Sequence, residues 1–283
     1  MLTYEQKRYI LTRACIPEHT VGLITYLSGG EPFLIDDFFV CRTKEWVILI
    51  GYPLEHEFDA AGFERVVEKI KKQFDPETLS LIAPELSSSI ADHCLESDSD
   101  HYYTLEVKKP VIRSVVRRNI KRARETLRVE RASNMGEPHR VLMDEFILRV
   151  YPPARVENMM SKLPGFLDDN HSALVLNARD NRNHLSAFYV IDLAGADFSN
   201  YIIGCYTRKK YVLGASDLLL DELIQLSAEF KKRYIHLGLG VNAGIRRFKI
   251  KWGAKPTRRY KMCALRLRKP SLIKTILSLP KFG

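Results

Sequence analysis

A cationic and aromatic run near the C-terminus carries the side chains of this sequence best suited to chemistry. Arg246, Arg247, Phe248 and Lys249 fall in a short predicted helix that follows an apolar strand, residues 234–240, ending on glycines. A glycine-rich strand end that leads into a cationic helix is suited to holding an anionic, phosphate-bearing substrate. We therefore expect Phe248, Arg246 and Arg247 to bind substrate, with the lysine side chain exposed beside them.

A second basic segment precedes the longest apolar helix predicted in this part of the chain. Three consecutive cations end a few residues before this helix, which is predicted to begin with Ser216 as its cap. The free N–H groups of a helix N-terminus attract phosphate. An ordinary loop that caps a core helix remains the alternative. The predicted phosphate-binding residues are Arg208, Lys209, Lys210, Gly214, Ala215 and Ser216.

Two further side chains are candidates for proton transfer. Tyr206 ends a predicted strand beside the basic loop, where its phenol could pass a proton, although tyrosines at strand ends more often line the edge of a core. His236 alternates with apolar neighbours along a strand, so we interpret it as a core histidine rather than a base. The sequence contains no paired acids, Ser-His-Asp order or nucleophilic cysteine motif that would indicate hydrolysis, and it shows no metal-ligand cluster.

The local order strand, Gly-Ile, Phe-Lys and Trp-Gly-Ala over residues 234–254 resembles the last conserved segment of Fem-type aminoacyltransferases and their GNAT-fold relatives. The basic helix at 117–124 is similar to a second Fem-type segment. The resemblance covers roughly residues 106–268. It implies an acyl-transfer enzyme in which Lys249 lies near the reacting carbonyl and stabilises its oxyanion, with Tyr206 as a second catalytic residue.

The same resemblance implies the donor and the acceptor. In GNAT enzymes that use acyl-CoA, the loop before the central helix reads Gln/Arg-x-x-Gly-x-Gly/Ala; here Tyr211 and Ser216 depart from that pattern, as expected of Fem-type proteins that use aminoacyl-tRNA. We expect no permanently bound cofactor, aminoacyl-tRNA or acyl-CoA as donor, and an amine or hydroxyl acceptor on a peptide, lipid or cell-wall precursor. The competing interpretation is a non-catalytic module that binds RNA or anionic lipid through its basic half.

The elements that must position these residues indicate an α/β protein. Before residue 100 the patterns predict a helix over 58–74, and after it a basic helix over 111–127 and a helical segment over 146–166 that breaks at the prolines 152–153. The remaining predicted elements are strands at 21–27, 33–41, 46–50, 79–83, 173–177, 186–192, 201–206, 234–239 and 260–267 and a helix at 216–232. The later strands and helices follow the order of a GNAT domain, so we expect two GNAT-like units, each a mixed sheet flanked by helices.

Charge divides the chain at the same place. Residues 1–105 hold 9 Lys and Arg against 18 Asp and Glu, whereas residues 106–283 hold 35 against 16, although the whole chain has a net charge of +10. An acidic polar stretch at 97–100 is predicted to be a surface linker. The predicted domains are an acidic unit at 1–105, a basic catalytic unit at 106–268 and a basic amphipathic tail at 269–283, and the basic part is expected to approach tRNA or an anionic membrane surface.

Composition limits the location. No apolar run approaches the roughly 18–20 residues that span a bilayer, and the first residues lack the apolar core of a signal peptide. The five cysteines are odd in number and scattered, which predicts unpaired thiols and a reducing, cytoplasmic location. The tail (residues 269–283) is expected to dock on the protein itself, with peripheral membrane binding as the alternative.

Overall fold

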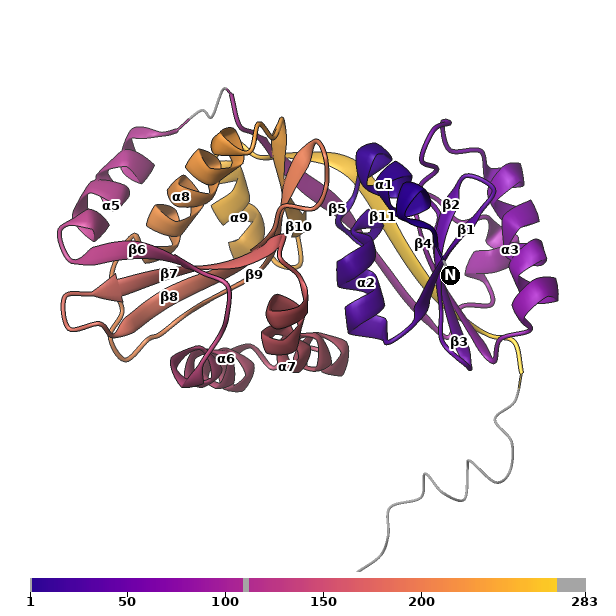
Figure 1. Cartoon of the computed structure of the whole chain (residues 1–283), viewed down its shortest axis with the longest axis horizontal. Helices are drawn as coiled ribbons and strands as arrows, with labels where there is room; N and C mark the ends of the chain where they lie inside the picture. Colours follow the sequence, from indigo (N-terminus) through magenta and orange to yellow (C-terminus); the bar gives the residue numbers. More distant parts are fainter. Residues whose placement is uncertain (1, 109–111, 269–283) are drawn as a thin grey trace, which may run out of the picture.

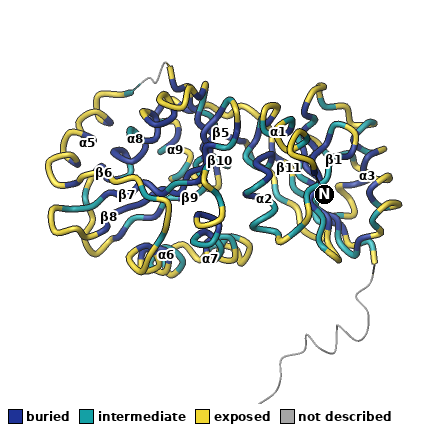
Figure 2. The backbone as a smooth tube through the Cα atoms, in the orientation of Figure 1, coloured by how far each residue is buried: buried dark blue, intermediate teal, exposed yellow. Residues whose placement is uncertain are grey.

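A computed structural model describes residues 2–108 and 112–268 of the chain. The described strands form one mixed eleven-stranded sheet in the order β1-β2-β3-β4-β11-β5-β10-β9-β8-β7-β6, with helices on both faces (Figure 1). Dark buried segments follow the strands and the inner sides of the helices, while the outer helix turns are exposed (Figure 2). The predicted α/β class, a mixed sheet flanked by helices, is therefore confirmed.

The N-terminal part of the sheet agrees with the predicted patterns in some of its elements. Its elements in chain order are α1 (Tyr4–Arg13), a 3₁₀ turn η1 (Pro17–His19), α2 (Val21–Ser28), β1 (Glu31–Ile35), β2 (Phe38–Arg42), β3 (Trp46–Ile50), α3 (Ala60–Phe74), β4 (Thr78–Ala83) and α4 (Ser88–Ala91). Helix α3 begins at an Asp59 cap and buries Phe63, Val66 and Ile70 against the strands. The predicted helix at 58–74 and the strands at 46–50 and 79–83 are confirmed.

Two of the N-terminal predictions are wrong. The segment predicted as a strand at 21–27 is helix α2, in which the Thr25 and Ser28 hydroxyls donate to the carbonyls of Val21 and Ile24 at 2.7 Å. Apolar runs this short fit a strand or a buried helix equally well. The predicted strand at 33–41 is a hairpin, because the chain turns at Asp36, whose φ is 51°.

The predicted linker at 97–100 lies inside β5 (Glu96–Glu106), a strand in the middle of the sheet. Strand β5 pairs antiparallel with β10 on one side and with β11 on the other. Its acidic start is exposed, and Arg155 neutralises it by ion pairs of 2.9 Å to Glu96 and 2.8 Å to Asp98. The linker prediction is therefore wrong. The acidic stretch can form a strand in the middle of the sheet because a cation from α7, far along the chain, neutralises it.

The remaining elements form the C-terminal part of the sheet and its helices. They are α5 (Ser114–Arg124), β6 (Leu127–Ala132), α6 (Glu137–Val150), α7 (Ala154–Asp169), β7 (Ala173–Asp180), β8 (Leu185–Asp192), β9 (Phe198–Tyr206), α8 (Ala215–Glu229), β10 (Tyr234–Leu239), α9 (Ala243–Lys251) and β11 (Lys255–Arg266). Helices α6 and α7 part at the predicted proline break. The predicted strands at 173–177, 186–192, 201–206 and 234–239 and the helix at 216–232 are confirmed within a few residues, whereas β6 was not predicted and α6 begins well before the predicted residue 146.

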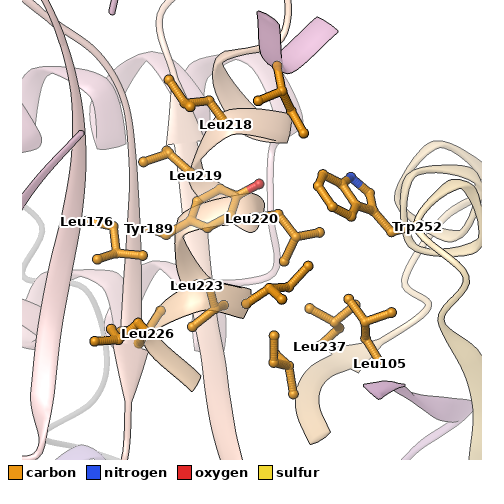
Figure 3. Close-up of a cluster of buried hydrophobic side chains, with 14 of the residues drawn as sticks. Leu105, Leu176, Tyr189, Leu218, Leu219, Leu220, Leu223, Leu226, Leu237 and Trp252 are labelled. Carbon is orange, nitrogen blue, oxygen red and sulfur yellow. The ribbon is translucent and has the colours of Figure 1, made fainter. Parts of the chain in front are cut away.

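Helix α8 is the centre of the C-terminal core. Leu218, Leu219 and Leu223 pack from α8 against strand residues such as Leu105 and Leu237 and against the fully buried Trp252 (Figure 3). Helices α5 and α9 lie on the same face of the sheet as α8, whereas α6 and α7 cover the other face. This packing fixes α9, and with it the predicted substrate-binding residues, against the end of β10.

Strand β11 links the two parts of the sheet. It pairs with β4 over residues 261–266 and with β5 over 255–264, so the last strand of the chain lies between two strands of the first half (Figure 1). The segment between α4 and β5 is joined to this strand by a disulfide between Cys94 and Cys263, whose Cα atoms are 5.4 Å apart. The prediction that all five thiols are unpaired is therefore wrong for these two, because β11 brings together cysteines 169 residues apart.

The described residues include no helix long and apolar enough to cross a membrane. The predicted tail at 269–283 lies outside the described residues. The predicted domain limits at 105 and 268 stay predictions. Strands from both sides of residue 105 belong to the same sheet.

Candidate functional site

The two parallel strands β9 and β10 separate along their length. They pair only where Phe198, Ser199 and Asn200 face residues 234–236. Beyond that point β9 continues beside β8, while β10 continues beside β5 after an irregularity that contains Gly238, whose φ is 70°. The facing edges of two neighbouring strands are thus no longer joined to each other. Such an opening can take an extended ligand that pairs with strand backbone.

Helix α9 begins immediately after β10 and carries Lys249. Asn242 caps α9 by accepting from the Ile245 N–H at 3.0 Å. The Lys249 side chain is 4% exposed, and its Nζ donates to the Leu239 carbonyl and lies 5.6 Å from the centre of the Tyr103 ring. The expectation of an exposed lysine is wrong, because α9 turns this position back onto the end of β10.

Burial also changes the chemistry of Lys249. Desolvation lowers the pKa of the Lys249 ammonium to about 8, and the carboxylate of Asp100 only partly opposes the shift. A group with this pKa is mostly charged at pH 7 and is close to releasing its proton. It can therefore act as an electrostatic donor near neutral pH.

The other predicted residues of α9 lie around this lysine. Phe248 is half-buried against the C-terminal core, and the Lys251 ammonium lies 4.8 Å from the centre of its ring. Lys251 also pairs with the buried Asp217 at 2.6 Å. Arg246 and Arg247 are exposed and form no ion pair with the rest of the described chain, which leaves both guanidinium groups free for an anion.

The predicted phosphate loop lies at the end of β9. Glu145 anchors its start by accepting from the Thr207 hydroxyl at 3.0 Å and from the Arg208 N–H at 3.3 Å. Arg208, Lys209 and Lys210 are exposed. The loop therefore presents its cations to solvent while its backbone is held by α6.

Ser216 does not cap α8 as predicted. The helix begins at Ala215 after Gly214, which has φ 89° and makes no side-chain cap, and the Ser216 carbonyl accepts from the Tyr189 hydroxyl at 2.8 Å. A Cβ on Gly214 would lie 2.4 Å from the Asn119 carbonyl of α5, so only glycine fits this turn. No side chain caps α8, but the Ala215 N–H donates to the Val212 carbonyl at 3.2 Å, which leaves the N–H groups of Ser216 and Asp217 as those that could meet an anion.

Tyr206, the last residue of β9, is half-buried. The Arg149 guanidinium lies 4.4 Å from the centre of its ring, and the Tyr211 ring packs edge-on at 5.8 Å. Tyr206 ends β9 and the phosphate loop follows it, while Lys249 touches the last residue of β10. Because these strands are parallel, the carboxyl ends of both lie at one edge of the sheet, which is where α/β sheets bind ligands.

Sequence reasoning missed a polar cluster that approaches the end of β10 from η1. The Tyr102 hydroxyl of β5 donates to Glu18 Oε2 at 2.7 Å, and the Tyr102 ring packs edge-on against His236 at 5.0 Å. Tyr102 is also the residue paired with Leu239, whose carbonyl holds Lys249. No local pattern marks this cluster, since its members come from η1, β5 and β10.

Burial changes the pKa of the acidic and basic groups in this cluster. Desolvation raises the pKa of Glu18 to about 7 and lowers the pKa of His236 to about 3, with Lys249 and Arg258 adding to the latter shift. His236 Nε2 is buried and has no hydrogen-bond partner in the described part of the chain. The interpretation of His236 as a core residue agrees with its complete burial, although it lies beside the candidate site.

Two other features do not belong to this site. Asp37, Glu55 and His56 could together offer three metal ligands, but Asp37 already accepts from the Glu55 and His56 N–H groups at 3.0–3.1 Å and so closes a loop. A cavity of about 730 Å³ lies between α2 and the ends of α7 and β8, lined in part by Thr20 and Asn170. It lies towards the start of β9, at the opposite end of that strand from Tyr206.

Helix α5 presents a one-sided cationic surface beside the phosphate loop. Arg117, Arg118, Lys121 and Arg122 are exposed, and none forms an ion pair within the described residues. A fifth cation of this helix, Arg124, does pair with an acid, Asp221 of α8, at 2.7 Å. A solvated helix face normally carries acids that neutralise its cations. Among the described residues, four cations of α5 have no such acid, and we call these four the α5 surface: Arg117, Arg118, Lys121 and Arg122.

Comparison with known proteins places the fold. No family model and no curated protein matches the sequence. Among solved structures, FemX aligns with a TM-score of 0.61 at 8% identity over 92% of this chain and 96% of that one. L-PGS from Bacillus licheniformis aligns with a TM-score of 0.57 at 14% identity over 97% and 95%. A tandem GNAT protein from the clavulanic acid biosynthesis pathway aligns at 0.51 and 10% identity over 82% and 79%. The chain has the fold of these proteins. The predicted resemblance to the Fem-like GNAT class is confirmed at the level of fold.

Proposed function

We propose that this chain is an acyltransferase built from two GNAT-like units, which moves an acyl or aminoacyl group to an amine or hydroxyl acceptor. The observation that carries the proposal is the buried Lys249 ammonium at the end of β10, beside the point where β9 and β10 separate. Proteins named FemX and L-PGS share the fold, and this supports the reaction class.

The residues support a direct transfer mechanism. The acceptor nitrogen would attack the carbonyl carbon of an ester or thioester lying between β9 and β10, and the carbonyl oxygen would gain negative charge. The Lys249 ammonium, held by the Leu239 carbonyl, would stabilise that oxyanion; loss of one such donor typically lowers the rate by about 10²–10³. Collapse of the intermediate breaks the bond to the donor oxygen or sulfur, which takes up a proton. Tyr206 is the proposed carrier of that proton: its hydroxyl gives a proton to the leaving oxygen or sulfur and takes up the proton that the acceptor nitrogen loses on forming the amide.

The donor would be held at the carboxyl ends of the same strands. The uncapped start of α8 and the exposed Arg208, Lys209 and Lys210 suit a phosphate group. Arg246 and Arg247 lie on α9 and would extend this positive region. Aminoacyl-tRNA is the donor we favour over acyl-CoA, because the free cations of the α5 surface extend well beyond what one pyrophosphate can occupy.

A non-catalytic module is the second candidate function. The α5 surface favours it, because a row of unpaired cations binds polyanions whether or not chemistry follows. On this account the fold would hold RNA or anionic lipid, and Lys249 would be a structural lysine that closes the end of β10.

Incubation of the purified chain with labelled donors separates the two functions. We would supply aminoacyl-tRNA pools and a panel of acyl-CoAs, each with a panel of amine and hydroxyl acceptors, and follow the label into new products by mass spectrometry. Enzyme-dependent amide or ester formation supports the transferase. Retention of tRNA or anionic vesicles with no transfer from any donor supports the binding module and contradicts our proposal.

A further inference from the structure

The turn between β10 and α9 holds one residue in a conformation that its side chain disfavours. Val241 has φ 53°, and the Asn242 N–H closes a three-residue turn around it by donating to the Gly240 carbonyl at 2.6 Å. Three-residue turns with a positive central φ are rare and strained, and a β-branched residue suits them poorly. The Val241 side chain is exposed, so its own packing does not account for the conformation.

Asp100 of β5 holds this turn from the neighbouring strand. One carboxylate oxygen accepts from the Val241 N–H at 2.7 Å, and the other accepts from the His101 N–H at 2.7 Å. A Cβ on Gly240 would lie 2.8 Å from Asp100 Oδ1, so the carboxylate packs directly against the backbone of the turn. Strained positions persist where their surroundings over-determine them, and a charged acceptor makes a strong hydrogen bond. Asp100 therefore supplies the constraint that Val241 requires.

The same turn determines where Lys249 lies. Helix α9 begins directly after the turn with Asn242 as its cap. The Lys249 ammonium returns to the carbonyl of Leu239, the last residue before the turn. The chain from Leu239 to Lys249 is thus a loop closed by a hydrogen bond, and Asp100 fastens it to β5 at Val241.

We propose that Asp100 is a positioning residue for acyl transfer: its carboxylate holds the strained turn between β10 and α9 and thereby fixes the Lys249 ammonium at the end of β10. This inference rests on the proposed function and adds a residue that acts through Lys249. Without the carboxylate, Val241 would relax towards a negative φ, and α9 would leave β10 in another direction. A displacement of about 1 Å at a reacting group can lower a rate by roughly 10²-fold.

The charge of Asp100 adds to this effect. The titratable and charged groups around the lysine and its turn are Asp100 and Tyr103 of β5, His236 of β10, Arg246 of α9 and Arg258 of β11. Burial lowers the pKa of His236 to about 3, so its imidazole is neutral near pH 7. The two arginines carry the same charge as the ammonium. Asp100 is the acid of this set, and its charge raises the pKa of Lys249 against the larger effect of desolvation.

The first test separates the charge of Asp100 from its hydrogen bond. Asp100→Asn keeps an oxygen that can accept from the Val241 N–H but removes the charge, so the pKa of Lys249 should fall below about 8. We would measure kcat/KM with the donor and acceptor that the wild-type chain uses. The ratio of variant to wild type, in which substrate ionisation cancels, should be near unity at about pH 6 and decline towards about pH 8. A merely structural residue would not give this pH dependence.

The second test concerns the strained turn. Asp100→Ala removes both the charge and the hydrogen bond. Its kcat should fall by roughly 10²-fold, while KM for the donor changes little, because the phosphate loop lies at the end of β9. Adding Val241→Asn should restore most of the rate, since asparagine adopts a positive φ more readily than valine, whereas the pH-dependent part of the defect should remain. Val241→Asn alone should raise Tm by about 2–4 °C.

A measurement without substrate keeps the inference separate from the proposed function. The ε-methylene NMR resonance of Lys249, identified by its loss in Lys249→Met, should titrate at lower pH in Asp100→Asn. Asp98→Asn is the matched control on the same strand. It removes a carboxylate that pairs with Arg155 at 2.8 Å, and it should leave both the titration and the rate unchanged.

The outcomes are distinguishable. If wild type transfers an acyl group and both Asp100 variants keep its rate and its Lys249 titration, the inference is wrong and the proposed function stands. If wild type transfers no acyl group from any donor, the proposed function fails, and with it the role of Asp100 in transfer. A shifted titration in Asp100→Asn would then show only that Asp100 holds the charge of Lys249.

Discussion

Lys249 shows what a motif predicts at the scale of one residue and what it does not. The Phe-Lys order and the preceding glycines predict a helix position after a strand, and the structure has the lysine there. The burial of its side chain could not be predicted, because it depends on the direction in which α9 leaves β10 and on contacts with Leu239 and Tyr103. The low pKa of its ammonium follows from that geometry and not from the motif.

Asp217 is a residue whose importance no sequence pattern indicates. The sequence predicts only an acid in the first turn of α8. In the structure it is buried and accepts from Asn119 Nδ2 at 2.9 Å, from Trp252 Nε1 at 2.9 Å and from the Lys251 ammonium at 2.6 Å. One carboxylate therefore joins α8 to α5 and α9, the two helices that carry the basic surfaces of the proposed site.

Replacing Asp217 by alanine should strongly destabilise the protein. The change leaves a buried indole N–H, an amide and a partly buried ammonium without their acceptor, which lowers the free energy of unfolding by roughly 3–5 kcal/mol. Asp221→Ala is the matched control on the next turn of α8, where the ion pair to Arg124 is more exposed and contributes about 1 kcal/mol or less. Urea unfolding of both variants measures the difference. Equal losses of stability would show that Asp217 does not hold the three helices together.

At the scale of elements, the predictions succeeded where one helix buries one apolar stripe and failed where tertiary contacts decide. Helices α3 and α8 have apolar residues at helical spacing, and both lie within a few residues of their predicted ranges. The apolar run at 21–27 fits a strand by its pattern, yet it packs as α2 beside α7. The acidic start of β5 has the composition of a linker. Its neutralising partner, Arg155, lies far away in the sequence, so the local pattern could not indicate a central strand.

The α5 surface allows a prediction about polyanion binding. Replacing Arg117, Arg118, Lys121 and Arg122 by glutamine should weaken tRNA binding. It should also reduce the slope of log K against log salt by about 0.7–0.9 for each phosphate that the variant no longer neutralises. The stability should change little, since these side chains are exposed and form no ion pair among the described residues.

The control for the α5 surface removes the same number of cations from α3. Arg65, Lys69, Lys71 and Lys72 lie in the acidic half, where the predicted contribution to binding is small. Filter binding or anisotropy over a range of salt concentrations would measure both quadruple variants. An unchanged salt slope in the α5 variant, or an equal loss of affinity in the α3 variant, would contradict a role for α5 in donor binding.

At the scale of the whole molecule, long-range strand pairing is what the sequence could not show. Most elements of the C-terminal part were predictable, because they have their own periodicity or turn residues, although strand β6 was not among them. The insertion of β11 between β4 and β5 was not, since it pairs residues about 150–190 positions apart. The disulfide between Cys94 and Cys263 follows from that insertion. The same insertion lets Tyr102 and Tyr260 pack edge-on, so the core beside the end of β10 needs both halves of the chain.

Acyl transfer by a lysine variant tests the central claim most directly. Lys249→Met removes the buried charge while filling the same space, so folding should be preserved, and donor binding by the exposed cations should remain. Lys232→Met is the matched control, because Lys232 is also buried and donates to the Leu193 and Gly195 carbonyls, near the start of β10. Lys251 is unsuitable as a control, since it pairs with Asp217.

The measurement is the single-turnover rate of transfer from the active donor, made on wild type and both variants at equal fractions of folded protein. We predict that Lys249→Met binds donor within a few-fold of wild type and transfers roughly 10²–10³ times more slowly, while Lys232→Met transfers at the wild-type rate. Wild-type transfer by Lys249→Met would contradict the account, because the buried ammonium would then close the end of β10 without stabilising the reaction.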